Sequence, residues 1–172
     1  FFQANLSILP DLIERVRGLD VFQGRKIFYD LYGGVGFFGL GVEDLMQKVV
    51  LIEENKSSIQ LAKHNVKHRG LTHFEIHEGR VEELLPTLTQ NHLVGEAVVM
   101  LDPPRAGLKP EAIEHLSDLK HLDAFLYLSC NPEALVRDLK VFEQKGFQIQ
   151  KIIPFDFFPR TKHLEVLVVL TR

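Results

Sequence analysis

The only cysteine of this 172-residue chain, Cys130, stands where a fold of alternating strands and helices could use a thiol chemically. It follows the apolar run 124–128, which is typical of a buried strand. Asn131 and Pro132 come next, and these residue types favour the N-cap and the first position of a helix. Because a helix N-terminus stabilises negative charge, we expect Cys130 to be favoured as a reactive thiolate. The alternative is a small buried side chain, the commoner fate of a single cysteine.

A glycine-rich segment after the first predicted strand indicates a cofactor site. Gly34, Gly36 and Gly39 satisfy the pattern G-x-G-x-x-G, in which glycines allow a tight turn and a close approach of the backbone to a ligand. Glu53 ends the second predicted strand, 17 residues after Gly36. An acidic residue there can accept hydrogen bonds from both hydroxyls of a ribose. We therefore expect Gly34, Gly36 and Glu53 to bind a cofactor, the alternative for Glu53 being a solvated charge.

Two acidic residues argue against a nicotinamide dinucleotide as that cofactor. Asp30 ends the first predicted strand just before the glycines, where it could meet an ammonium group. Asp102 begins the segment Asp102-Pro103-Pro104-Arg105 after the fourth predicted strand, and this segment has no role in hydride transfer. S-adenosylmethionine carries an ammonium, a sulfonium and a ribose, and it suits these carboxylates better. The residues therefore predict S-adenosylmethionine as the cofactor.

Hydrophobic periodicity predicts seven strands that alternate with helices in one domain. The predicted strands cover residues 26–31, 49–53, 74–77, 97–101, 124–129, 147–153 and 164–170. The predicted helices cover residues 6–18, 36–45, 81–88, 111–119 and 133–145, and one more lies between a cap at Asn55 and an end at Gly70. This alternation predicts an α/β fold with a doubly wound, mostly parallel seven-stranded sheet of the Rossmann-like type. Because no helix separates the last two strands, we expect 164–170 to be antiparallel between its neighbours.

Composition narrows the class of protein but does not identify a partner. Hydrophobic content of 45% and charged content of 25% are typical of an ordinary globular domain, and a net charge of -3 gives no sign of nucleic-acid binding. No apolar run is long enough to span a membrane, and no signal-peptide pattern is present, so we expect no membrane association. One cysteine excludes a disulfide framework and favours a reducing, cytoplasmic location.

Two further expectations concern metals and chain extent. The eight histidines show no metal-ligand spacing, so we expect no metal. The chain begins at Phe1 rather than at methionine, which suggests that an upstream part is missing. We expect a monomer.

Six segments, in order along the chain, resemble the RNA uracil-5-methyltransferase family, which methylates uridine C5 in transfer and ribosomal RNA. They span residues 2 to 165 and therefore nearly the whole chain. The segments are Phe2–Asn5, Asp30–Gly36, Ile52-Glu53 with Ala62 and Asn65 downstream, Asp102–Leu108, Ser129–Pro132 followed by Arg137–Leu139, and Asp156–Glu165.

The resemblance implies a methyltransferase catalytic domain over 1–172 and an RNA substrate, either ribosomal or transfer RNA. It implies that Gln3, Tyr32, Glu53 and Asp102 bind S-adenosylmethionine. It also implies that Cys130 is the nucleophile and Glu165 the base. The family usually carries RNA-binding domains upstream of the segment that contains Gln3.

The chain departs from the family pattern at three positions. The family often has cysteine at Gly33, a polar residue at Phe37 and an acidic or amide residue at Arg80.

The chemistry of uracil methylation accounts for these residue types independently. Uracil C5 is a poor nucleophile until a thiolate adds to C6 and produces an enolate that can attack a sulfonium methyl group. A base must then remove the C5 proton so that the thiolate can leave. Cys130 and Glu165 supply these roles, and Arg105 could stabilise charge on the uracil oxygen or orient Glu165, the alternative being a surface salt bridge. His163 is more often structural than catalytic.

Aromatic residues near the last strand offer one more possible contact with RNA. Phe155, Phe157 and Phe158 could stack on a flipped base. We expect at least two of them to pack in the core instead.

Other functions remain open at this point. A cytosine-5 RNA methyltransferase also uses thiol addition, but that family has a second cysteine in the segment corresponding to Asp102–Arg105. An amino-group methyltransferase would have an aromatic residue where Arg105 stands, and it would leave Cys130 without a role. A non-catalytic cofactor- or RNA-binding module is disfavoured by intact Cys130 and Glu165. A nicotinamide oxidoreductase is the weakest alternative.

Overall fold

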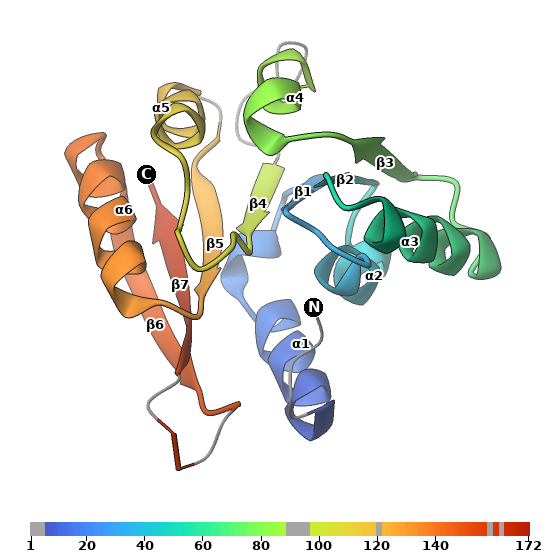
Figure 1. Ribbon diagram of the computed structural model, residues 1–172, viewed down its shortest axis with the longest axis horizontal. Coiled ribbons are helices and arrows are strands. Elements are labelled where there is room, and N and C mark those ends of the chain that lie inside the picture. Colours follow the sequence, from blue (N-terminus) through green and yellow to red (C-terminus); the bar gives the residue numbers. More distant parts are fainter. Residues whose placement is uncertain (1–5, 89–96, 120–121, 158–159, 162–163) are drawn as a thin grey trace.

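The computed structural model describes residues 6–88, 97–119, 122–157, 160–161 and 164–172, and its elements alternate as predicted (Figure 1). The strands are β1 (Ile27–Leu31), β2 (Lys48–Glu53), β3 (Phe74–Glu78), β4 (Ala97–Leu101), β5 (Ala124–Ser129), β6 (Gln148–Phe155) and β7 (Glu165–Thr171). The α-helices are α1 (Leu9–Arg17), α2 (Phe37–Val42), α3 (Lys56–His68), α4 (Val81–Leu88), α5 (Pro110–Asp118) and α6 (Pro132–Gln144). Three short 3-10 turns cover Leu6–Ile8, Asp20–Phe22 and Glu43–Leu45.

All seven strands form one sheet in the order β3-β2-β1-β4-β5-β7-β6. The pairs β1–β2, β1–β4, β2–β3 and β4–β5 are parallel. Strand β7 lies between β5 and β6 and is antiparallel to both. The predicted Rossmann-like fold with an antiparallel C-terminal strand is therefore confirmed. Strand order reverses between β1 and β4, and in open α/β sheets ligands bind at the carboxyl ends of the strands beside such a point.

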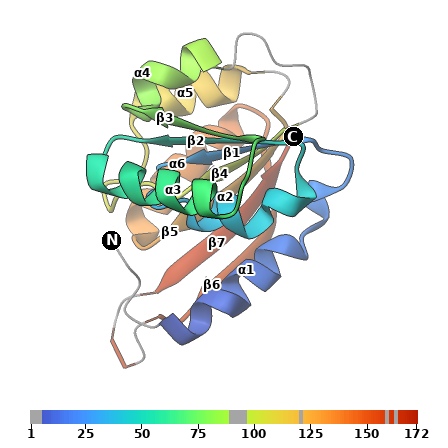
Figure 2. The ribbon, with the colours of Figure 1, turned by 90° about the vertical axis from the view of Figure 1, so that its right-hand side faces the viewer.

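In the described part of the chain, three α-helices cover each face of the sheet, and each face has its own hydrophobic core. Buried side chains of α1, α2 and α3 pack on one face, as shown by Leu12, Phe38 and Ala62. Side chains of α4, α5 and α6 pack on the other, for example Leu85 and Leu116. Figure 2 shows α1 and α4 on opposite sides of the strands. Within the described part of the chain, none of the helices combines the length and apolar character needed to cross a membrane.

Element boundaries differ from the predicted ones by a few residues at most, for local reasons. The first predicted helix begins as a 3-10 turn because Pro10 belongs in the first turn of α1. The second ends at Val42 and continues as the 3-10 turn Glu43–Leu45. Strand β6 starts one residue later than predicted because Phe147 is buried against the rings of Phe125 and Phe142.

Candidate active site

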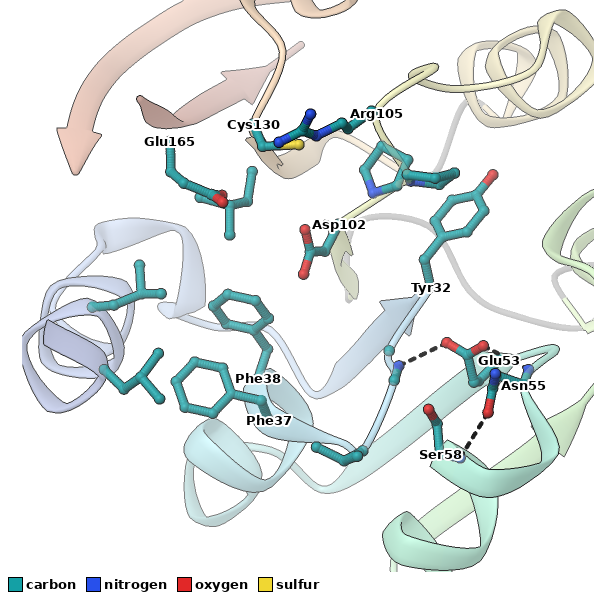
Figure 3. Close-up of a pocket in the computed structure, with 18 residues that line it drawn as sticks. Tyr32, Phe37, Phe38, Glu53, Asn55, Ser58, Asp102, Arg105, Cys130 and Glu165 are labelled. Atoms are coloured by element: carbon teal, nitrogen blue, oxygen red, sulfur yellow. Dashed lines mark hydrogen bonds between the residues drawn. The ribbon is translucent and has the colours of Figure 1, made fainter. Parts of the chain in front are cut away.

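A cavity of about 490 Å³ opens at the carboxyl ends of the central strands. Residues that directly follow β1, β4 and β5 line it, namely Tyr32, Asp102 and Cys130. Glu53 at the end of β2 and Glu165 at the start of β7 complete its polar wall (Figure 3). The fold thus brings residues from across the chain to one edge of the sheet.

The glycine loop and Glu53 form one unit on the β1–β2 side of this cavity. The N–H of Gly34 donates to Glu53 Oε2 at 2.9 Å, and the N–H of Asn55 donates to Glu53 Oε1 at 2.7 Å. Tyr32 and Gly34 adopt positive φ values of 60° and 54°, which turns the loop sharply toward the cavity. Asn55 then caps α3, because its side chain accepts a hydrogen bond from the N–H of Ser58. Glu53 is therefore held facing the cavity with lone pairs left on both oxygens.

Asp30 lies beneath the glycine loop and does not line the cavity. Its side chain is fully buried, and Oδ2 accepts a hydrogen bond of 2.8 Å from the N–H of Gly39. Oδ1 has no hydrogen-bond partner among the described residues. Burial raises the pKa of Asp30 to about 7, and the negative charge of Glu53 adds to this increase. The predicted contact of Asp30 with an ammonium group does not fit this placement, because the residue is fully buried and is not among those that line the cavity.

Asp102 does line the cavity, together with two other carboxylates, Glu53 and Glu165. Burial raises the pKa of Asp102 to about 8, and the negative charges of Glu165, Asp30 and Glu53 act in the same direction. A cationic ligand would relieve this repulsion, so the carboxylates suit the sulfonium and ammonium of S-adenosylmethionine. Among the described residues, no group of three or more His, Cys, Asp or Glu side chains is arranged to hold a metal ion.

Cys130 and Glu165 meet because of the antiparallel pairing of β5 with β7. Ser129 of β5 is paired with Val166 of β7, so the next residues toward the cavity, Cys130 and Glu165, face each other at the same edge. Glu165 is only 3% exposed, and Cys130 is partly exposed. Arg105 extends toward the Cys130 sulfur from the loop that follows β4 (Figure 3).

The thiol of Cys130 is not favoured as a thiolate in this arrangement. Burial raises the pKa of Cys130, and the negative charge of Glu165 adds to this effect. The charge of Arg105 and a hydrogen bond with it lower the pKa but do not outweigh the other two causes. The expectation that Cys130 is favoured as a thiolate is therefore not met, because the pKa of the thiol is raised. A helix N-terminus stabilises a negative charge only modestly. The loss of hydration on burial and the repulsion from Glu165 together destabilise the thiolate by more than this.

The structure also shows an apolar wall that the sequence did not indicate. Leu9 and Leu12 of α1 and Phe37 and Phe38 of α2 line the side of the cavity opposite the β4 loop. The only sequence signal was the apolar face of the first helix, which did not show that this face borders a site.

The remaining predicted residues have mixed placements. Gly36 precedes α2 with a φ of 83° and is buried outside the cavity lining. Phe155 and Phe157 pack in the core, as expected for two of the three aromatic residues. Gln3, Phe158 and His163 lie outside the described residues.

Comparison with known proteins yields one consistent group. The model of the tRNA (uracil-5-)-methyltransferase family matches residues 1–172. The chain is 37% identical over 171 residues to an uncharacterized RNA methyltransferase of Protochlamydia amoebophila, covering 99% of this chain and 38% of that protein. It is 34% identical over 172 residues to an uncharacterized RNA methyltransferase of Thermotoga maritima, covering 100% of this chain and 38% of that protein.

A solved structure agrees with these relatives. The tRNA (uracil-54, C5)-methyltransferase of Pyrococcus abyssi, in complex with S-adenosyl-L-homocysteine, superposes with a TM-score of 0.81 at 30% identity. The match covers 99% of this chain and 40% of that one. The chain thus spans about two fifths of the length of the relatives it matches.

Proposed function

Because the chain belongs to the tRNA (uracil-5-)-methyltransferase family, we propose that it transfers a methyl group from S-adenosylmethionine to C5 of a uridine in RNA. One observation carries the proposal: Cys130, Glu165 and Arg105 converge on a single cavity whose other end is lined by Glu53 and the glycine loop. A nucleophile, a base and a cationic group thus face a site that suits a methyl donor.

The cofactor end uses residues that the loop geometry already orients. S-adenosylmethionine supplies an electrophilic methyl group on a sulfonium. Glu53 accepts hydrogen bonds from the ribose hydroxyls through its remaining lone pairs, and Asp102 faces the positive charge. Tyr32 packs along the loop, and its hydroxyl is fixed by a 3.1 Å hydrogen bond to Glu82. Gly34 lets the backbone approach the ligand closely.

At the catalytic end, Cys130 begins as a thiol and releases its proton to solvent before it attacks. Its sulfur then bonds to C6 of uracil, and the C5=C6 electron pair moves toward C5 and O4. C5 next bonds to the methyl carbon as the carbon–sulfonium bond breaks. Glu165 takes the C5 proton, the C5=C6 bond re-forms, and the Cys130 sulfur leaves C6 with its electron pair. Arg105 stabilises the negative charge of the sulfur and of the enolate oxygen.

The target RNA is a separate part of the proposal. The matched relatives are longer than this chain, and we propose that residues 1–172 form the catalytic domain of a protein of that kind. Both transfer and ribosomal RNA are candidates for the substrate.

Two variants separate the roles of the nucleophile and the base. The protein is incubated with methyl-labelled S-adenosylmethionine and unmodified transfer or ribosomal RNA, and products are resolved on denaturing gels and by nucleoside analysis. Cys130→Ala is expected to give neither labelled RNA nor a covalent complex. Glu165→Gln is expected to accumulate a labelled RNA–protein complex, because only proton removal is blocked. Glu114→Gln changes an exposed carboxylate of α5 and serves as the control.

Three results would contradict the proposal. Near wild-type methylation by Cys130→Ala would show that the thiol is structural. Normal turnover by Glu165→Gln without a trapped complex would place the base elsewhere. Label recovered in cytidine rather than in 5-methyluridine would make the chain a cytosine methyltransferase.

A further inference from the structure

Asp138 on α6 is a buried charge that no step of the proposed reaction uses. Its side chain is 0% exposed. Oδ2 accepts hydrogen bonds from the N–H of Leu108 at 2.8 Å and from the hydroxyl of Tyr127 at 2.7 Å. Oδ1 accepts one from Arg137 Nε, also at 2.8 Å. A buried carboxylate is costly unless several donors satisfy it, so these partners fix its position closely.

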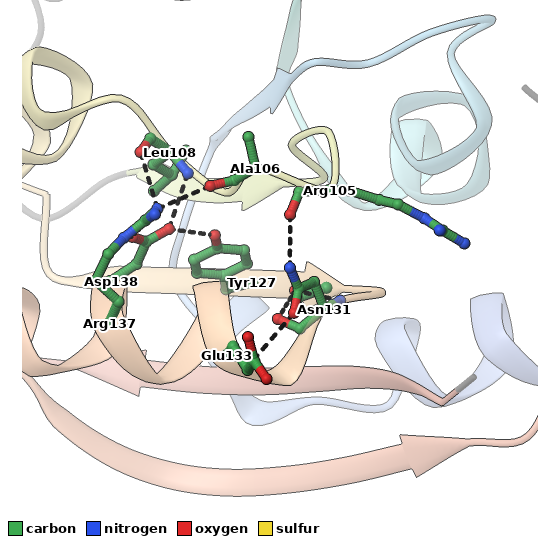
Figure 4. Close-up of polar contacts among 9 residues, drawn as sticks. Arg105, Ala106, Leu108, Tyr127, Asn131, Glu133, Arg137 and Asp138 are labelled. Atoms are coloured by element: carbon green, nitrogen blue, oxygen red, sulfur yellow. Dashed lines mark hydrogen bonds and ion pairs between the residues drawn. The ribbon is translucent and has the colours of Figure 1, made fainter. Parts of the chain in front are cut away.

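Of the partners of Asp138, Leu108 belongs to the loop that carries Arg105, and Arg137 of α6 also binds this loop (Figure 4). Arg137 Nη2 donates to the carbonyl oxygens of Ala106, at 2.9 Å, and Leu108, at 3.3 Å. Asn131, the N-cap of α6, donates from Nδ2 to the carbonyl oxygen of Arg105 at 2.9 Å. The first two turns of α6 therefore hold the backbone of residues 105–108 at four polar atoms.

The packing between this loop and α6 leaves no spare room. Gly107 has a φ of 79°, and its N–H closes a turn onto the carbonyl oxygen of Pro104 at 2.8 Å. A methyl group added at Gly107 would lie 2.6 Å from both Asp138 Oδ2 and Arg137 Nη2. Only glycine fits at position 107 when the loop lies this close to α6. The side chains of α6 therefore constrain the backbone conformation of the loop.

We infer that Asp138, Arg137 and Tyr127 form a clamp that positions the Arg105 guanidinium beside the sulfur of Cys130. The backbone carbonyl of Arg105 is hydrogen-bonded to Asn131, the residue after Cys130. The clamp holds the loop at its other end, where the N–H of Leu108 donates to Asp138. The side chain of Arg105 therefore starts from a fixed point relative to the thiol. This inference rests on the proposed role of Cys130 as the nucleophile.

The clamp has a consequence that can be measured without RNA. Among the described residues that line the cavity, the charged or titratable groups nearest the Cys130 thiol are Arg105 from the β4 loop, Glu165 from β7 and Asp102 at the end of β4. Arg105 is the one whose charge lowers the pKa of the thiol, and Glu165 raises it. Any change that lets Arg105 move away from the sulfur should leave the thiol harder to ionise.

Alkylation of Cys130 by iodoacetamide reports this directly, because the chain has no other cysteine. The rate is measured against pH in wild type, Arg137→Ala, Tyr127→Phe and Asp138→Asn, with Arg105→Ala as the limiting case. We expect the pH midpoint of the Arg137 and Asp138 variants to move upward toward that of Arg105→Ala. The rate at pH 7 should fall roughly three- to tenfold.

Lys140→Ala is the matched control for Arg137→Ala. Lys140 is an exposed cation three residues further along α6. This variant removes the same charge and should keep the wild-type alkylation profile. If the clamp acts in catalysis, kcat of Arg137→Ala falls while the affinity for S-adenosylhomocysteine stays within about twofold of wild type.

Arg137→Ala tests the clamp even if Asp138→Asn fails to fold, since the Arg137 side chain is 57% exposed. The inference is wrong if folded Arg137→Ala keeps the wild-type profile while Arg105→Ala shifts it, or if Arg105→Ala shifts nothing. If Arg137→Ala shifts the pH profile of Cys130 alkylation but the wild-type protein methylates no RNA, the inference about the clamp stands and only the proposed function is refuted.

Discussion

Glu53 gives the most direct test of the cofactor end, because both of its carboxylate oxygens are already engaged by backbone N–H groups of Gly34 and Asn55. Glutamine is usually a mild replacement for glutamate, but here its NH2 group must face one of these two donors. Glu53→Gln therefore loses a backbone acceptor as well as the charge, whereas Glu53→Ala loses both acceptors. We expect the two variants to weaken cofactor binding to a similar extent.

The size of the expected loss in cofactor affinity follows from the hydrogen bonds that Glu53 would accept from a ribose. Hydrogen bonds to a charged group contribute roughly 1.5–3 kcal/mol, so affinity should fall roughly 10- to 150-fold. Calorimetry with S-adenosylhomocysteine measures this, and urea unfolding shows whether the loop itself has been destabilised. Glu54→Gln changes the next residue, which is exposed and only loosely paired with Arg80 at 3.7 Å, and should bind within about twofold of wild type. Unchanged affinity in both Glu53 variants would refute the assignment of the ribose site.

Two further predictions concern the residues beneath the glycine loop. The folded state raises the pKa of Asp30 from 3.8 to about 7, so it binds that proton more tightly than the unfolded chain does. The stability that this carboxyl contributes is therefore complete below about pH 4 and is lost as the pH rises to about 7. Asp30→Asn should remove this pH-dependent contribution to stability. Between pH 4 and pH 8, the free energy of unfolding of the variant should therefore rise by roughly 2–4 kcal/mol relative to that of wild type, as measured by urea titration. An equal difference between the two proteins at both pH values would contradict the assigned pKa. Gly39→Ala should destabilise the fold by roughly 1–3 kcal/mol, because a Cβ there would lie 2.8 Å from the Phe74 ring and 3.0 Å from Asp30 Oδ2; urea unfolding identical to wild type would show that the loop packs less closely.

The sequence predicted those parts of the site that depend on local rules. Glycines 34 and 36 mark a turn because their φ values are positive, and Asn55 and Asn131 mark helix starts because their side chains accept backbone N–H bonds. These signals place Tyr32, Glu53 and Cys130 at strand ends without knowledge of the fold. The neighbourhood of Glu165 could be predicted only in outline, because it depends on the exact register of β7 against β5.

What the sequence could not predict depends on packing between distant segments. The apolar wall arises because α1 and α2 cover the same face of the sheet beside the cavity. The clamp joins the β4 loop to a helix about thirty residues further along the chain. No local pattern marks Asp138 as different from any other helical aspartate, apart from its position among the apolar residues Leu135, Leu139 and Phe142.

The two corrected expectations, for Asp30 and for Cys130, have the same physical origin. Both rest on a local rule: a carboxylate at a strand end faces the ligand, and a thiol at a helix N-terminus ionises. Burial overrides each rule, and the carboxylates at this edge of the sheet add to it. Among the described residues that line the cavity, Arg105 alone carries a positive charge, against Glu53, Asp102 and Glu165. Arg105 is therefore the described cavity residue whose charge favours ionisation of Cys130, and we propose that the polar contacts of its loop serve to hold it there.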